Sequence, residues 1–524
     1  MAALCCAGVT LVAAANGDAD WAVDGGSQRG WHHSPLTQID ATNVTRLRPA
    51  WFFELDTTRG QESEPVVVDG VMYVSSAWSK VYALDAATGR LLWRYDPQVP
   101  GDVGARACCD VVNRGVAVYQ GRVYVAALDG RLIALDARTG RVRWSRQTVD
   151  PRGMYTITGV PRIARGKVII GNGGAEFGTR GYVTAYAADT GRQLWRFYFV
   201  PPGPGRARDH AASDEVLARV ASPTWSGDWA AYGGGATAWN AISYDEAQRV
   251  LFVGTGNGSP WNHRFRSNGQ GDNLFVCSIV ALDVDTGRYR WHYQVNPADS
   301  WDYNAVMPMV QADLTIGSRV RKTLLQAPKN GFFYVLDRTS GALLSAEPFV
   351  DNVTWATRID VPSGRPVEVA NAHYTQGAFR LSPSPTGAHN WHPMAFSPLT
   401  GQVYFSGTEN AALIRSEERF TPLAPPVDST GVDVQYLPTT RRYLQAWDPV
   451  ANRRVWRIEQ PASQQPGGVL ATASGLVFQG IGAVTGELVA YRAEDGARLW
   501  SHHLPNAPLP APISYSIDGV QYIA

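Results

Sequence analysis

Two cysteines, Cys108 and Cys109, stand side by side, and their spacing limits what they can do. Adjacent Cα atoms lie about 3.8 Å apart across a trans peptide, which is shorter than the usual separation in a disulfide. A bond between them would close a strained small ring, and backbone strain tends to occur at functional sites. The alternative is a pair of buried thiols, and the two residues alone leave both interpretations open.

Two cationic side chains stand in short polar stretches. Arg114, in DVVNRG, carries a planar guanidinium that suits a carboxylate partner. Lys329 stands in APKNG. Taken singly, both are better interpreted as surface charges, because Lys and Arg are rarely buried. By the same standard, Glu176 and Asn257 could be ordinary turn residues and Trp239 a core aromatic.

The composition indicates which elements must position these residues. The chain has 524 residues, of which 45% are hydrophobic and only 18% charged, with 52 Gly, 33 Pro and 18 Trp. Turn residues and aromatics in such numbers favour many short strands joined by tight turns, and long all-β chains often form one domain. The net charge of +1 provides neither a basic stripe for nucleic acid nor an acidic tail.

The first fifteen residues, MAALCCAGVTLVAAA, are almost wholly apolar and end in an A-x-A-like cleavage pattern. We therefore expect residues 1–15 to be a signal peptide for export to the periplasm, and residues 16–524 to form one mature domain. The run is too short for a membrane span. No Lys or Arg precedes it, so the alternative is that the true N-terminus lies elsewhere. Cleavage would leave Cys108, Cys109 and Cys277 in a compartment that permits disulfides.

One phrase recurs along the chain: a strand-like apolar run, a hydrophobic-Asp pair, a Thr-Gly turn and a Trp. Neighbouring copies are separated by about 45 to 55 residues, or by near twice that, which is typical of four-stranded propeller blades. The clear copies are VYALDAATGRLLW, LIALDARTGRVRW, VTAYAADTGRQLW and IVALDVDTGRYRW, which end at Trp93, Trp144, Trp195 and Trp291. The worn copies are FYVLDRTSGALLS, with Ser345 in place of Trp, QAWDPVANRRVW, ending at Trp456, and VAYRAEDGARLW, ending at Trp500.

Each part of the phrase has a physical role. β-Branched and aromatic residues suit the strand, and the Thr-Gly pair supplies a turn with a permissive backbone at Gly. The terminal Trp offers a large apolar area for packing against the adjacent blade. One blade cannot bury its own faces, so the repeat predicts an all-β ring of blades. The alternative is a β-sandwich with coincidental hairpins.

Further segments, taken in order, resemble the PQQ-dependent quinoprotein alcohol dehydrogenases, a family of eight-bladed β-propellers with tryptophan-docking repeats. The similarity extends from about Trp21 to the last residue. It is greatest to the periplasmic quinohaemoprotein branch, whose other members carry a C-terminal cytochrome c domain. Each segment alone would be weak, but the ordered set is specific. The segments are ACCDVVNRG, ITGVPR, GNGGAEFG, GGGATAW, GTGNGSPW, SWDYN, APKNGFFYVLDR and GAHNWHP.

This resemblance implies a binding site for pyrroloquinoline quinone (PQQ). Cys108 and Cys109 occupy the positions of a vicinal disulfide that lies against one face of PQQ in the family, and Trp239 matches the Trp that closes the other face. Arg114 would pair with a cofactor carboxylate, and Lys329 would bond the quinone oxygens. The other implied cofactor-binding residues are Glu62, Thr158, Gly174, Ala175, Thr237, Asn390 and Trp391.

The resemblance also implies a metal ion and a catalytic base. Glu176, Asn257 and Asp302 match the family's metal positions, and carboxylate and amide oxygens suit calcium rather than zinc or copper. A related subgroup uses lanthanides and has an Asp two residues after the catalytic one, where this chain has Asn304. Asp302 matches the base that accepts the alcohol's hydroxyl proton while hydride passes from the carbinol carbon to PQQ. The implied activity is oxidation of small-molecule alcohols to aldehydes or ketones.

The electron acceptor and the end of the chain leave alternatives open. No C-x-x-C-H motif for covalent haem occurs, so electrons would pass to an external acceptor such as a cytochrome c. The last residues, DGVQYIA, lack the final strands expected of the family, which suggests truncation at the C-terminus. The alternative functions are a PQQ dehydrogenase for a polymeric alcohol, an aldehyde or a sugar, and a non-catalytic scaffold of PQQ-like repeats.

Overall fold

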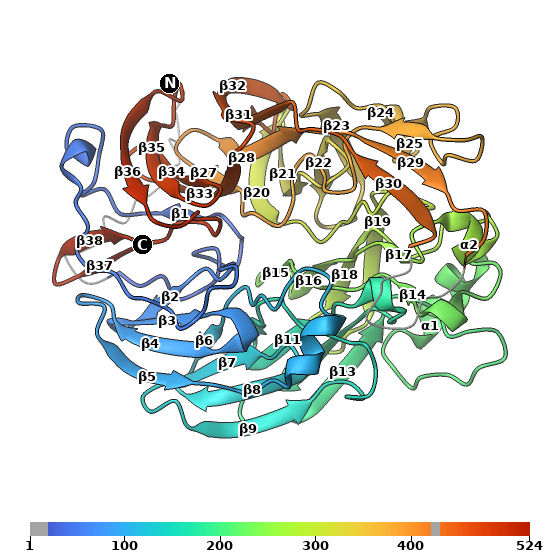
Figure 1. Ribbon diagram of the computed structural model, residues 1–524, viewed down its shortest axis with the longest axis horizontal. Helices are drawn as coiled ribbons and strands as arrows, with labels where there is room; N and C mark the ends of the chain where they lie inside the picture. The colour runs from blue at the N-terminus through green and yellow to red at the C-terminus, as the bar shows by residue number, and fades with distance from the viewer. Residues whose placement is uncertain (1–18, 421–429) are drawn as a thin grey trace, which may run out of the picture.

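The computed structural model describes residues 19–420 and 430–524, and most of its regular structure is antiparallel β-sheet. Within these residues, six sheets have four strands each. A seventh has five, because β1 (His33–Ser34) pairs in parallel with β33 at its edge. Figure 1 shows the sheets arranged around a central axis, like the blades of a propeller. The expected signal peptide, residues 1–15, lies outside the described residues.

The complete sheets follow one another along the chain, and all but the last, which also takes β1, are built from one stretch of sequence each. The first three contain β2–β5 (Val66–Val68, Val71–Ser75, Val81–Asp85, Leu91–Tyr95), β6–β9 (Ala117–Tyr119, Arg122–Ala126, Arg131–Asp136, Val142–Gln147) and β10–β13 (Arg162–Ala164, Lys167–Gly171, Tyr182–Ala187, Gln193–Tyr198). The next three contain β15, β16, β18 and β19 (Ile242–Asp245, Val250–Gly254, Ser278–Asp283, Tyr289–Gln294), β20–β23 (Met309–Ile316, Arg319–Gln326, Phe332–Asp337, Leu343–Pro348), and β27, β28, β31 and β32 (Ala395–Ser397, Gln402–Glu409, Arg441–Asp448, Arg453–Gln460). The last contains β1 with β33–β36 (Gln465–Thr472, Leu476–Gly482, Gly486–Arg492, Arg498–Leu504).

The repeated phrase forms the turn between the two outer strands of a sheet. In the first copy, the Asp85 carboxylate accepts hydrogen bonds from the Thr88 backbone N–H at 3.0 Å and from its hydroxyl at 2.8 Å. Gly89 then adopts a φ of 71°, in the left-handed region that favours glycine. Asp136 and Asp283 make the same pair of bonds in later copies. The Asp and Thr side chains therefore fix the point at which one strand ends and the next begins.

The Trp of a clear copy docks onto the turn of the next sheet. The Trp93 indole donates to the Ala137 carbonyl at 2.8 Å. Its ring covers Gly140, where a Cβ would come within 2.7 Å of the ring. Trp144 and Trp195 donate to the turns of the following sheets in the same way. The turn glycine is thus required twice, for its backbone conformation and for the approach of the indole.

The worn copy at Ser345 replaces this apolar contact by a polar one. The side-chain amide of Asn452, in the turn of the following sheet, donates to the Ser345 hydroxyl at 3.0 Å. The Trp447 indole donates to Asn452 Oδ1 at 2.7 Å and so fixes the orientation of the amide. Two neighbouring sheets therefore remain joined without a tryptophan at this position.

The two ends of the described chain meet between the first and the last complete sheets. The hairpin β37–β38 (Ser514–Ile517, Val520–Ile523) forms a separate two-stranded sheet, and a bridge pairs Ser516 with Ala19. One apolar cluster joins this hairpin to β2–β4 on one side and to β33–β35 on the other. The hairpin therefore packs against both complete sheets.

Short insertions between the strands of the complete sheets finish the fold, and one of them carries Ala175 and Glu176. None of the helices in residues 19–420 and 430–524 has the length and hydropathy needed to cross a membrane. The insertions that concern the site are η3 (Gly101–Arg106), η4 (Ala175–Phe177), η7 (Trp229–Tyr232), β14 (Gly234–Gly235), β17 (Gly258–Ser259) and α2 (His263–Ser267). The others are η1 (Val44–Arg46), η2 (Ala77–Ser79), α1 (Asp214–Val216), η5 (Leu217–Ala221), η6 (Ser222–Thr224), β24 (Ala356–Asp360), β25 (Arg365–Glu368), β26 (Phe379–Leu381), β29 (Ala412–Ser416) and β30 (Val432–Tyr436).

Candidate functional site

Glu176 lies on η4, a single helical turn with a glycine at each end. Gly174 precedes the turn with a φ of 98°, and Gly178 follows it with a φ of 75°. A Cβ on Gly174 would also lie 2.6 Å from the carbonyl oxygen of Met154. Glycine is therefore needed at these positions to form the turn that carries Glu176 and the neighbouring, buried Ala175.

Asn257 and Asp302 lie on two loops attached to the same sheet. Asn257 lies between β16 and β17, and Asp302 lies in the connection from β19 to β20. Asn257 is buried, whereas the Asp302 side chain is 14% exposed. Asp302 has a φ of 58°, a left-handed conformation that a non-glycine residue keeps only where its surroundings hold it. The contacts around Asp302 must therefore supply that restraint.

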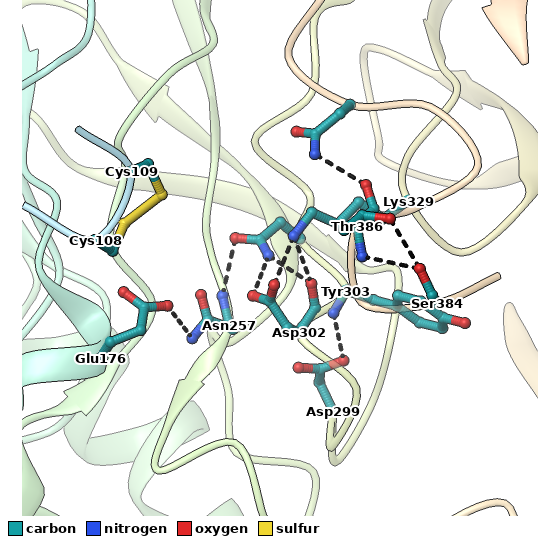
Figure 2. Close-up of polar contacts among 12 residues, drawn as sticks. Cys108, Cys109, Glu176, Asn257, Asp299, Asp302, Tyr303, Lys329, Ser384 and Thr386 are labelled. Atoms are coloured by element: carbon teal, nitrogen blue, oxygen red, sulfur yellow. Dashed lines mark hydrogen bonds and ion pairs between the residues drawn. A yellow bond between two sulfur atoms is a disulfide. The ribbon is translucent and has the colours of Figure 1, made fainter. Parts of the chain in front are cut away.

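Hydrogen bonds join the three predicted metal positions into one group. The Asn257 amide donates to Glu176 Oε1 at 3.1 Å, as Figure 2 shows. The Asn304 amide donates to Asp302 Oδ1 at 2.9 Å. Its oxygen accepts from the Asn257 backbone N–H at 3.2 Å. The structure thus gathers Glu176, Asn257 and Asp302, with Asn304 connecting two of them.

Lys329 holds the other side of the Asp302 carboxylate (Figure 2). Its ammonium donates to Asp302 Oδ2 at 2.7 Å and to the Asp302 carbonyl at 3.0 Å. Lys329 lies between β21 and β22 and is buried, with Gly387 packed against its aliphatic chain. The interpretation of Lys329 as an exposed surface charge is therefore excluded, and the carboxylate is held by donors at both oxygens.

Burial and mutual repulsion make this group unfavourable for two negative charges. Burial raises the pKa of Glu176, and the charge of Asp302 raises it further. Burial also raises the pKa of Asp302, against the opposing effects of Lys329 and Asn304. A cation between the carboxylates would favour the ionised forms of both.

The donor chemistry of the group fits a hard divalent cation such as calcium. Glu176, Asn257 and Asp302 supply carboxylate and amide groups, and rotation of the Asn257 amide can present its oxygen. Residues 19–420 and 430–524 contain no cluster of three or more His, Cys, Asp or Glu side chains arranged to hold a metal. The set here has only two carboxylates, so its third donor must be the amide.

A second group of predicted residues gathers around Arg114. Its guanidinium pairs with Glu62 at 2.8 Å and donates to the Thr158 hydroxyl at 2.6 Å. It also lies over the rings of Trp239 and Trp391, at 4.9 and 5.5 Å from their centres. Glu62, Arg114 and Trp391 line one cavity, and Arg114 Nε is buried without a hydrogen-bond partner. A buried guanidinium with a spare donor beside two indoles fits a planar anion.

Asn304 connects the two groups, which sequence reasoning did not predict. Its side-chain oxygen accepts from the Trp239 indole at 3.1 Å, in addition to its bonds with Asn257 and Asp302. The sequence indicated only that Asn304 stands two residues after Asp302. Trp239 and Asn257 stand far from Asn304 in the chain, so no local pattern could have identified these two bonds.

The adjacent cysteines form a disulfide. The sulfur atoms of Cys108 and Cys109 are bonded, with their Cα atoms 3.8 Å apart, and both residues are exposed. Figure 2 shows the disulfide in the same view as Glu176. Cys277 is a buried free thiol, as its apolar surroundings in the sequence predict. The alternative of two buried thiols at Cys108 and Cys109 is therefore wrong.

The remaining predicted cofactor residues lie beside the two groups. Thr237 is buried two residues before Trp239, and its carbonyl accepts from the backbone N–H of Gly256 at 2.9 Å. Asn390 precedes Trp391, and its amide donates to the Thr386 carbonyl at 3.0 Å. The predicted residues thus converge on one region of the molecule from many separate segments.

Comparison with known proteins relates this region to characterised sequences. The family model described as "PQQ: Glucose/ethanol/alcohol dehydrogenase, beta-propeller domain" matches residues 21–347 and 451–523. The quinohemoprotein alcohol dehydrogenase ADH IIB of Pseudomonas putida is 48% identical over 514 residues, which cover 96% of this chain and 73% of that protein. The crystal structure of the quinohemoprotein alcohol dehydrogenase from Comamonas testosteroni has a TM-score of 0.92 and 45% identity, covering 96% of this chain and 76% of that one. A europium-containing methanol dehydrogenase has a TM-score of 0.87 and 34% identity, covering 96% and 89% of the two chains.

Proposed function

Since this chain belongs to the family of PQQ-dependent alcohol dehydrogenases, we propose that it oxidises alcohols to aldehydes or ketones, with PQQ and calcium as its cofactors. The observation that carries the proposal is the convergence of Glu176, Asn257 and Asp302, with Lys329 on the Asp302 carboxylate. A non-catalytic scaffold would have no need to bury these groups together. Bound PQQ would supply the two-electron redox chemistry, with calcium acting as a Lewis acid.

Asp302 is the proposed catalytic base. Lys329 and Asn304 donate to its two oxygens, so the carboxylate is fixed in orientation before an alcohol arrives. A base held in this way would take the hydroxyl proton of the alcohol and keep it on the Asp302 carboxylate. A positioned general base contributes about 10²- to 10⁴-fold to a rate. The Lys329 ammonium would stabilise negative charge that develops beside Asp302.

The group around Arg114 is the proposed holder of the PQQ carboxylates. Arg114 and Thr158 supply donors, and Trp239 supplies an aromatic face. The Cys108–Cys109 disulfide is proposed for the opposite face of the ring. The further proposed contacts are Glu62, Gly174, Ala175, Thr237, Lys329, Asn390 and Trp391.

The finer points of organisation are also proposals. The packing of β37–β38 between the first and last complete sheets supports an eighth blade position in the ring. We assign residues 16–524 to this single domain and residues 1–15 to a signal peptide, which implies a periplasmic location. The proposed electron acceptor is an external cytochrome c. N-terminal sequencing of protein recovered from the periplasm tests both the signal peptide and the periplasmic location.

Reconstitution tests the function. The purified chain is loaded with PQQ and calcium, and the absorbance of the bound quinone is recorded together with dye reduction on primary and secondary alcohols, aldehydes and sugars. We expect alcohol-dependent dye reduction that requires both cofactors and stops when a chelator removes calcium before PQQ is added. Dye reduction that depends on added NAD, or that proceeds equally without PQQ, would overturn the proposal.

A further inference from the structure

Arg266, on α2, is a fully buried cation without a carboxylate ion pair among the described residues. Its exposed fraction is 0%, and burial lowers the pKa of its guanidinium. All three nitrogens are used in hydrogen bonds to neutral oxygens. Nε donates to Asn273 Oδ1 at 2.9 Å, Nη1 to the Pro260 and Trp261 carbonyls at 2.7 and 2.8 Å, and Nη2 to the Asp299 carbonyl at 2.6 Å. A buried charge satisfied in this way is costly to replace, because its loss leaves several buried carbonyls without donors.

The three backbone carbonyls that Arg266 binds belong to the two loops that carry Asn257 and Asp302. Pro260 and Trp261 follow Asn257 by three and four residues, and Asp299 precedes Asp302 by three. One rigid guanidinium therefore spans the gap between the loop after β16 and the loop after β19. Asn257 and Asp302 stand 45 positions apart in the sequence, on loops attached to one sheet, and Arg266 adds a direct connection between these loops.

The guanidinium also lies directly against the backbone of the first loop. A Cβ on Gly258, the residue after Asn257, would come within 2.3 Å of Arg266 Cζ. Glycine at this position therefore allows the planar group to pack against the peptide that follows Asn257. A lysine has one compact donor group and no planar fork, so it could not make the same four bonds.

The second loop needs restraint, because its backbone is strained at two residues. Ala298 and Asp302 have φ values of 54° and 58°, which side-chain-bearing residues rarely adopt. The Asp299 side chain accepts from the Tyr303 backbone N–H at 3.2 Å, while its carbonyl accepts from Arg266. Arg266 therefore binds the loop at Asp299, which lies between the strained residues Ala298 and Asp302.

We propose that Arg266 is a positioning residue for the reaction, which sets the separation of the Asn257 and Asp302 loops so that both side chains meet one calcium ion. It acts through the backbone carbonyls of Pro260, Trp261 and Asp299 and touches neither substrate nor cofactor. The inference rests on the proposed function of the site. It adds a residue outside the family motifs to those that determine calcium affinity and the placement of the base.

Calcium affinity measured without alcohol tests this role. Apo protein with PQQ present is titrated with calcium, and the bound quinone is followed by absorbance. Arg266→Lys keeps the charge but loses the fork, so we expect the calcium Kd to rise about 10-fold or more. At saturating calcium, kcat should stay several-fold below that of the wild type, with KM little changed, because Asp302 remains misplaced. Arg264→Lys, the same substitution at an exposed position of α2, should leave both values unchanged.

A second variant covers the case in which Arg266→Lys does not fold. Asn273→Gly removes the acceptor of Arg266 Nε, at a position outside both ligand loops. Glycine readily adopts the φ of 56° found at residue 273, so the substitution does not strain the backbone. The variant also loses the bonds from Asn273 Nδ2 to the Thr224 carbonyl and the Ser267 hydroxyl, which do not involve the ligand loops. We expect the loss of the Arg266 bond to raise the calcium Kd about 3-fold. A lower unfolding temperature with wild-type calcium Kd and kcat, in whichever variant folds, would overturn the inference. Failure of the wild-type protein to bind calcium and PQQ would instead overturn the proposed function.

Discussion

The outer ring of tryptophan contacts and the central site are held together by different kinds of interaction. In the ring, one local phrase repeats, and the Trp of each clear copy docks on the turn of the next sheet, as when Trp93 covers Gly140. In the site, Asn304 binds groups at Trp239 and Asn257, and Arg266 binds the Asp299 carbonyl, across long separations in the chain. The ring therefore keeps its packing at the worn copy, where the Asn452 amide donates to Ser345, whereas the contacts of Asn304 and Arg266 are not part of a repeat. Stability and activity should accordingly respond to different substitutions.

The substitution with the largest expected effect should lower the turnover rate without lowering the stability of the fold. Asp302→Asn removes the base and one proposed metal ligand but keeps the size of the side chain. We expect turnover of the reconstituted protein to fall about 10⁴-fold, the upper end of the range for general bases, with little change in the unfolding temperature. Steady-state dye-linked rates and thermal unfolding measure the two quantities. Asp433→Asn, the same substitution at an exposed position, is the matched control. Near-normal turnover in Asp302→Asn would contradict the assignment of Asp302 as the catalytic base.

A substitution in the ring of tryptophan contacts should have the opposite effect, a loss of stability without a loss of turnover. Trp144→Ala removes a buried indole that donates to the Ala188 carbonyl at 3.0 Å and covers Gly191. We expect the free energy of unfolding to fall by about 3 kcal/mol or more. The turnover of molecules that remain folded and loaded with cofactor should be unchanged, because the contact is between outer strands. Denaturant unfolding and active-site titration with PQQ test both parts, and a loss of kcat per loaded molecule would break the distinction between ring and site.

A smaller effect within the site tests the connecting role of Asn304. Asn304→Asp keeps an oxygen to accept from Trp239 and from the Asn257 N–H, but replaces the donor to Asp302 by a like charge. The added carboxylate repels Asp302, and a bound cation relieves this repulsion, so we expect calcium to bind about 10-fold more tightly. A trivalent lanthanide ion should gain more affinity than calcium, since it carries more charge. Equal gains for both ions would show that charge at residue 304 does not select the metal.

The smallest expected effect compares a clear copy of the repeat with the worn one. Ser345→Ala removes the hydroxyl that accepts from the Asn452 amide at 3.0 Å. We expect a loss of about 1 kcal/mol in the free energy of unfolding, well below that for Trp144→Ala. Urea unfolding of the two variants side by side gives the comparison. Equal losses would mean that the polar contact at Ser345 holds its sheets as strongly as a docked tryptophan does.

The two regions also differ in how far the sequence predicts them. The repeated phrase predicted the turns, the position of Trp93 and its packing on the next sheet, because all of these depend on residues close together in the chain. The repeat does not fix the number of blade positions. Among residues 19–420 and 430–524, β37–β38 forms a two-stranded sheet of its own that is bridged to Ala19.

The candidate site was predictable only through resemblance to a family. Taken singly, Glu176 and Asn257 look like turn residues, yet the structure joins them by a hydrogen bond. Asn304 and Arg266, which connect the loops of the site, do not belong to the residues that the resemblance assigned to metal or cofactor binding. Arg266 stands in an ordinary polar segment and binds mainly backbone carbonyls, and any residue type offers a carbonyl. Contacts of this kind leave no spacing or residue type in the sequence to detect.

The most direct test is the anomalous scattering of a crystal grown with PQQ and calcium. The account predicts one calcium peak with an oxygen of each of Glu176, Asn257 and Asp302 within about 2.6 Å, the usual calcium–oxygen distance. Ordered PQQ with the calcium ion elsewhere, or with these three side chains turned away from it, would contradict the account.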